Sequence, residues 1–165
     1  MAMQRYEEAA RLMQRYPDLM DFSGPCTEEL INDTEVKLNV KFPSTYRKFL
    51  ADYGAGSFAS SEIYGIVKKN PDAMMIPNVL GATLSARQDY NLPEYLILLS
   101  ELGNGAVYCL DCSEIGESPV VVYWSTFPTE VQTYEIEAEN FAEYFFAEVK
   151  LAIEIETEDG AIMPT

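Results

Sequence analysis

Residues 94–124 decide the fold of this chain. Their sequence, EYLILLSELGNGAVYCLDCSEIGESPVVVYW, contains three apolar runs at 95–99, 106–110 and 119–124. The Gly-Asn-Gly turn at 103–105 tolerates the positive φ of a tight hairpin, and Gly116 and Pro119 mark a longer second connection. The three runs therefore predict an antiparallel meander. Because they are apolar almost without a break, helices should cover both faces of this sheet.

Helical patterns occur on both sides of the meander. Apolar residues recur every three to four positions, and Thr27, Ser44, Asn78 and Asn140 are predicted N-caps. Helices are predicted over 1–16, 28–38, 45–53 and 79–89 and from Asn140 to Ala152. Short strands are predicted at 57–59 and 62–67, feeding the central sheet, and at 131–136, whereas 17–26 is predicted to be a loop.

This order of elements predicts an α+β fold, in which a central antiparallel sheet packs against helices from the N-terminal half and a C-terminal helix. The length fits one domain spanning residues 1–165. Its core is expected at 27–152, with an N-terminal helix at 1–16 and a flexible acidic tail at 154–165. The aromatic stripe of the 45–53 helix (Tyr46, Phe49 and Tyr53) is interpreted as core rather than as a ligand platform.

The chain is strongly acidic, with 27 acidic and 11 basic residues and a net charge of −16. This charge disfavours nucleic acid and anionic membranes as partners and permits a basic one. The alternative is that acidity only keeps the protein soluble. No apolar run reaches the ~20 residues of a membrane span, and residues 1–21 lack the apolar centre of a secretory signal, so a cytoplasmic protein is expected.

The sequence offers little catalytic or metal-binding chemistry. It has no histidine, no Gly-rich phosphate loop and no Gly-x-Ser-x-Gly motif, so we predict no enzyme activity, no cofactor and no metal site. Cys109 and Cys112 have a Cys-x-x-Cys spacing, but they end a strand instead of beginning a helix, and zinc would need further ligands. Core packing for Cys109 and a turn position for Cys112 are the favoured interpretation.

A candidate partner-binding patch comes from acidic residues at the loop end of the meander, flanked by aromatic side chains. Aromatic residues beside carboxylates can anchor a basic partner. The predicted residues are Glu101, Asp111, Glu114, Glu117, Tyr108, Tyr123 and Trp124. Alanine at Glu101, Asp111 or Glu117 is expected to weaken partner binding while leaving folding intact. The alternative is ordinary solvated turns around an aromatic core. Glu135, Glu137 and Glu139 alternate along a second acidic stretch, for which a solvated edge strand is favoured.

Two stretches resemble the SUKH superfamily of Smi/Knr-type proteins. Residues 38–54, LNVKFPSTYRKFLADYG, are similar to the family's Leu-Pro link followed by a capped Tyr-x-x-Phe-Leu helix that ends in glycine. Residues 99–111, LSELGNGAVYCLD, resemble its central hairpin. The similarity covers roughly residues 27–152. The chain departs from the pattern in reading Phe42-Pro43 at the link and in lacking an N-terminal tryptophan.

The resemblance implies a non-enzymatic role. Bacterial members of the superfamily are typically immunity proteins that bind a cognate polymorphic toxin, often a nuclease and in some systems of LXG type, inside the producing cell. Eukaryotic relatives are regulators or scaffolds, so a cytoplasmic adaptor is the alternative. A basic toxin suits an acidic inhibitor, because charge attraction accelerates encounter and like charge repels wrong partners.

Overall fold

The computed structural model describes residues 1–125 and 134–158 of the chain. Within these ranges the fold is α+β, as the sequence predicts. The helices are α1 (Ala2–Gln14), α2 (Glu28–Leu38), α3 (Ser44–Asp52), α4 (Val79–Tyr90) and α5 (Phe141–Glu158), with a 3-10 turn at Pro17–Leu19. The strands are β1 (Met20–Phe22), β2 (Gly56–Phe58), β3 (Ser61–Ile63), β4 (Leu96–Glu101), β5 (Ala106–Asp111), β6 (Val120–Trp124) and β7 (Glu135–Ala138).

The predicted meander is confirmed as an antiparallel sheet with the order β4-β5-β6-β7. Gly103 and Gly105 adopt the positive φ angles, 80° and 91°, that the hairpin between β4 and β5 requires. The four residues at 96–99 are completely buried, so both faces of the sheet are covered at the first strand. The last strand is β7; residues 131–133 of the predicted 131–136 strand lie outside the described residues.

A second sheet, with the order β1-β2-β3, corrects two predictions. Residues 20–22 form a strand instead of part of a loop, and β2 and β3 pair with β1 instead of joining the central sheet. The two sheets meet where the Tyr64 N–H donates to the Leu99 carbonyl at 2.8 Å. A three-residue strand has no periodicity to recognise, and β1 depends on a partner more than thirty residues away in the chain.

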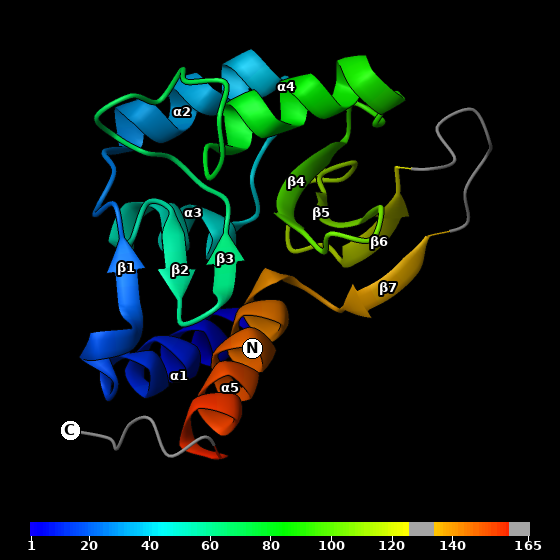
Figure 1. Cartoon of the computed structure of the whole chain (residues 1–165). Coiled ribbons are helices and arrows are strands. Elements are labelled where there is room, and N and C mark those ends of the chain that lie inside the picture. Colours follow the sequence, from blue (N-terminus) through cyan, green and yellow to red (C-terminus); the bar gives the residue numbers. More distant parts are fainter. Residues whose placement is uncertain (126–133, 159–165) are drawn as a thin grey trace.

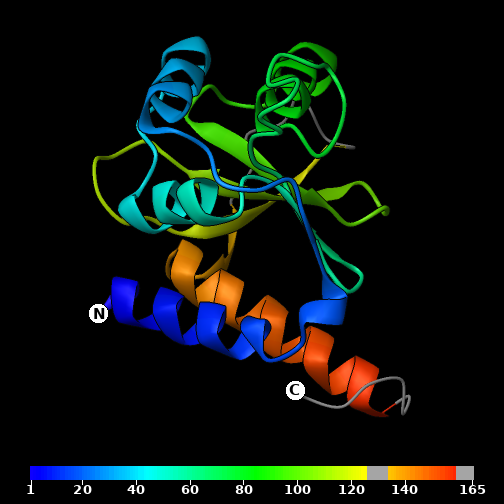
Figure 2. The same cartoon turned by 90° about the vertical axis from the view of Figure 1, so that its left-hand side faces the viewer.

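The helices form layers on either side of the sheets. Figures 1 and 2 show α2 and α4 together on one side and α1 and α5 together on the other, with α3 beside the small sheet. Tyr6 of α1 stacks on Phe145 of α5 with ring centroids 5.5 Å apart. The N-terminal helix is therefore packed into the same body as the predicted 27–152 core.

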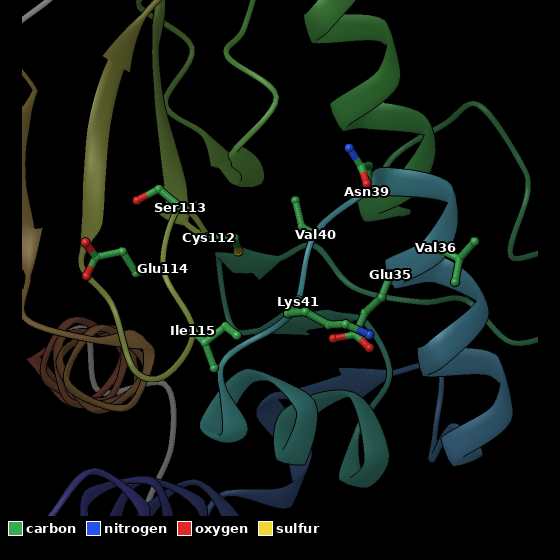
Figure 3. Close-up of a pocket in the computed structure, with 9 residues that line it drawn as sticks. All are labelled: Glu35, Val36, Asn39, Val40, Lys41, Cys112, Ser113, Glu114 and Ile115. Carbon is green, nitrogen blue, oxygen red and sulfur yellow. The ribbon is translucent and has the colours of Figure 1, made fainter.

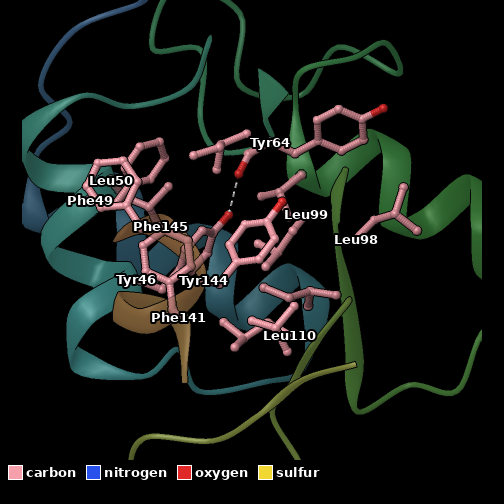
Figure 4. Packing of buried hydrophobic residues seen from close by; sticks show 14 of the residues in the cluster. Tyr46, Phe49, Leu50, Tyr64, Leu98, Leu99, Leu110, Phe141, Tyr144 and Phe145 are labelled. Carbon is pink, nitrogen blue, oxygen red and sulfur yellow. Dashed lines mark hydrogen bonds between the residues drawn. The ribbon is translucent and has the colours of Figure 1, made fainter. Parts of the chain in front are cut away.

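The stripe on α3 is core, as predicted. Figure 4 shows its aromatic rings packed against those of α5. Phe49 is completely buried, and its ring centroid lies 5.5 Å from that of Phe141 and 5.6 Å from that of Phe145. The Tyr46 hydroxyl donates to the Tyr64 carbonyl at 2.8 Å, so this buried polar group is satisfied.

Two of the four predicted caps are confirmed. Thr27 accepts from the Leu30 N–H, and Asn140 accepts from the Glu143 N–H at 2.9 Å. Ser44 is instead the first residue of α3, which has no local side-chain cap. The Asn78 side chain likewise makes no cap and accepts from the Val67 N–H at 2.9 Å.

The C-terminal helix is longer than predicted. Helix α5 continues to Glu158, so the first part of the predicted tail, residues 154–158, is helical, while residues 159–165 lie outside the described range. None of the helices that the structure describes combines the length and apolar character needed to cross a bilayer.

Candidate functional site

The seven predicted partner-binding residues do not form one patch. Leu96 pairs with Asp111 across the first hairpin, whereas Ala106 pairs with Trp124 across the second. Glu101 and Trp124 therefore lie at one end of the central sheet, and Asp111, with the loop carrying Glu114 and Glu117, lies at the other. The strand between these ends spans ~17 Å at the usual rise per residue.

Tyr108 and Tyr123 lie on opposite faces of the sheet, and each contacts other side chains of the protein. The Tyr108 ring packs against Tyr144 of α5 at 5.5 Å, and its hydroxyl donates to Glu137 at 3.4 Å. Tyr123 is buried, stacks on Tyr90 of α4 at 6.0 Å and donates to the Tyr90 carbonyl. For Tyr123 the buried-core alternative describes the structure.

Two of the predicted acidic residues hold the loop between β5 and β6 in place. The Glu117 carboxylate accepts from both the backbone N–H, at 3.2 Å, and the hydroxyl of buried Thr45. Glu117 thus caps α3 from a different part of the chain, in the role predicted for Ser44. The Asp111 carboxylate accepts from the Ser113 N–H at 2.9 Å and forms the turn that starts the loop.

Between these fixed ends the loop displays Glu114 and Ile115. Ile115 is 93% exposed. Across from it, Val36 of α2 is 74% exposed. The space between them is a groove of about 370 Å³, shown in Figure 3 with α2 on one side and the 112–115 loop on the other. The groove is lined by Glu35, Val36, Asn39, Val40, Lys41, Cys112, Ser113, Glu114 and Ile115.

Hydrogen bonds hold the wall of this groove on the α2 side. Helix α2 ends at Leu38, and the next residue, Asn39, adopts the left-handed conformation with φ 57°. The buried Glu35 carboxylate then fixes the link to α3, because it accepts from the Phe42 N–H and from the Arg47 guanidinium, each at 2.6 Å. Its charge is compensated inside the fold, so Glu114 is the lining carboxylate available to a partner.

The thiol of Cys112, which lines the groove, lacks the properties of a reactive cysteine. Burial raises the pKa of the Cys112 thiol to about 12, with the nearby Asp111 carboxylate as a further cause. Burial likewise raises the pKa of Cys109, which is completely buried. Cys109 is core and Cys112 begins the loop, as predicted, and neither has the lowered pKa of a reactive thiol.

The groove combines exposed apolar side chains with a carboxylate. Within residues 1–125 and 134–158, no group of three or more carboxylate or thiol side chains is placed to hold a metal ion. The groove presents two exposed apolar side chains beside the Glu114 carboxylate, and the hydrogen bonds of Glu35 hold its α2 side in place. Sequence reasoning missed Val36 and Ile115; the available signal was an isoleucine within a predicted polar turn.

The chain was also compared with known protein families. Residues 5–150 match the family model SUKH_5, described as SMI1-KNR4 cell-wall. The match begins within α1, so it includes the N-terminal helix as well as the 27–152 region that carried the resemblance.

Proposed function

The chain belongs to the SMI1-KNR4 family of the SUKH superfamily, and on this premise we propose that it is an immunity protein that binds and neutralises a cognate toxin. The superfamily is known for immunity proteins, which are generally non-enzymatic. The proposed partner is a basic toxin domain of nuclease type, of the kind carried by LXG systems, inside the producing cell. Family membership is the observation that carries this proposal.

The charge of the chain supports a basic partner. A nuclease domain must attract phosphates, so its active surface is positive, and a protein with a net charge of −16 is drawn to it. At physiological salt this attraction is screened beyond ~8 Å, so specificity has to come from direct contacts.

The groove between α2 and the 112–115 loop is our candidate for those contacts. Binding energy in protein interfaces is concentrated in a few apolar side chains that become fully buried, surrounded by polar groups that exclude water. Ile115 and Val36 are exposed enough to act as such anchors, and Glu114 can pair with a lysine or arginine at their edge.

The test is co-purification with the toxin domain encoded by the neighbouring gene, followed by size exclusion at low and high salt. A stoichiometric complex that survives high salt and lacks toxin activity is the expected result. A folded chain that forms no complex would refute the proposed function and favour the adaptor alternative.

Point variants test whether the α2 groove is the interface, independently of whether the protein is an immunity protein. Ile115→Ser should weaken the complex by roughly tenfold or more, the effect of an anchor worth ~1.4 kcal/mol. The matched control is Ile155→Ser, which alters an exposed isoleucine of α5. Equal affinity of the two variants would remove the groove from the interface while leaving the immunity function intact.

A further inference from the structure

A second exposed apolar surface lies at the other end of the central sheet, in the connection between β3 and α4. Met74, Met75 and Ile76 follow one another in the chain and are 61%, 65% and 50% exposed. Single exposed apolar residues are ordinary, but contiguous ones mark interaction surfaces. Methionine is common on such surfaces because its flexible, polarisable side chain adapts to different partners.

The backbone that displays these residues is anchored on both sides. Buried Asn78 accepts from the Val67 N–H at 2.9 Å and donates to the Asn70 carbonyl at 2.9 Å, which closes the loop at its base. Lys37 of α2 pairs with Asp72 at 2.8 Å on the outer side. The exposure of the three side chains is therefore imposed by the fold.

A glycine in helix α4 allows this loop to pack closely against the helix. A Cβ atom at Gly81 would lie 2.5 Å from the Ala73 carbonyl oxygen and 2.7 Å from the Met74 Cα. Only glycine allows the loop to lie so close to the helix, although glycine costs about 1 kcal/mol in a helix interior relative to alanine. The close approach positions Met74 and Met75 beside the next turns of α4.

A cavity of about 170 Å³ lies beneath the three apolar side chains and is walled by α4 residues that include Ala86 and Tyr90. A cavity of ~150 Å³ in a protein interior can hold a benzene molecule, so one large apolar side chain fits here. A neighbouring cavity of about 260 Å³ runs on to the hairpin at Gly103 and Gly105. Tyr90 and Glu101 line both cavities.

The mouth of this space is acidic. Asp89 and Glu101 line the first cavity, and both are exposed. Glu62 lies close enough to Glu101 that burial and this neighbouring charge together raise the pKa of Glu62. The nearest base on α4, Arg87, is directed elsewhere, because it donates to the Glu94 carbonyl at 2.6 Å.

We propose that this methionine channel, formed by Met74, Met75, Ile76, Tyr90, Asp89 and Glu101, binds a short extended segment of a partner protein. The segment carries one large apolar side chain, which enters the 170 Å³ cavity, next to a lysine or arginine, which pairs with Glu101 at the acidic mouth. The inference is independent of the toxin: it concerns the end of the sheet opposite the α2 groove and applies equally to an adaptor.

The test uses the full chain with ¹³C-labelled methionine methyl groups and the probe peptide acetyl-Lys-Leu-Arg-Phe-Lys-amide. The Met74 and Met75 signals, assigned from Met74→Leu and Met75→Leu, should shift and saturate below about 1 mM peptide. The signal of Met13, which is completely buried, should stay in place. A peptide with serine in place of leucine and phenylalanine has the same charge and should cause no saturable shift.

Charge variants complete the experiment. Glu101→Gln should weaken binding of the probe roughly threefold, the effect of one partly exposed ion pair. Glu154→Gln, which removes an exposed charge from α5, should leave it unchanged. No shift up to about 1 mM peptide, equal shifts with the serine peptide, or equal effects of the two substitutions would each overturn the proposal.

Discussion

Replacing Glu117 by alanine should destabilise the protein, because its carboxylate caps α3. The structure thus corrects the expectation from the sequence that alanine at this position leaves folding intact. Thr45, which is 1% exposed, donates both its N–H and its hydroxyl to that carboxylate. Loss of a side-chain N-cap costs about 0.5–2 kcal/mol, and a buried hydroxyl left without an acceptor about 1 kcal/mol. Because Glu117 itself is exposed and water can reach the site, we expect a loss of about 1.5 kcal/mol.

Urea unfolding followed by circular dichroism measures this loss directly. The midpoint should fall with an unchanged m-value, and the melting temperature should drop by about 3–6 °C for a chain of this size. Glu114→Ala is the control: it lies in the same loop, is exposed, and has no hydrogen bond or ion pair among the residues that the structure describes, so it should change stability by less than about 0.5 kcal/mol. If the two variants are equally stable, Glu117 does not cap α3.

Three further predictions concern other sites. Gly81→Ala should lower the unfolding midpoint despite alanine's better helix propensity, because the new Cβ would lie 2.5 Å from the Ala73 carbonyl oxygen; a rise in the midpoint would contradict the close packing. The pKa of Cys112 is raised to about 12, so iodoacetamide should alkylate this partly buried thiol far more slowly in the folded chain at neutral pH than in urea; similar rates would contradict the raised pKa. Burial also raises the pKa of Glu148, so folding favours its protonated form, and the contribution of Glu148 to stability is lost as pH rises through the folded pKa. Glu148→Gln can still accept from the Ser61 hydroxyl and should therefore be more stable than the unsubstituted protein at neutral pH. In urea titrations this difference should vanish below pH 4.5.

The fold was largely predictable where the signal lies in consecutive residues. The apolar runs of the meander, the α3 stripe and the Asn140 cap are each recognisable in the local sequence, and each is confirmed. The small sheet was not predictable in this way, because β1 has three residues and acquires its strand geometry from β2. The end of α5 was placed too early, because its glutamate-rich last turns look like a solvated tail.

The candidate site was predictable only in part. Acidic loop residues can be recognised in the sequence, but their partners cannot. Glu117 and Glu114 look alike along the chain, yet one is bound to Thr45, 72 residues away, and the other is free to meet a partner. Tyr123 looked like an anchor beside the loops and is instead buried against α4.

The sequence by itself determined the class of the fold, the family and the acidic character of the protein, because these depend on residue types and on spacing along short segments. Only the tertiary structure decided which side chains remain available to a partner. It separated Glu101 from Asp111 at opposite ends of one sheet, brought Val36 to the same groove as Ile115, and exposed Met74 and Met75 above a cavity. The physical reason is that exposure and pairing depend on contacts between residues far apart in the chain, which no local pattern encodes.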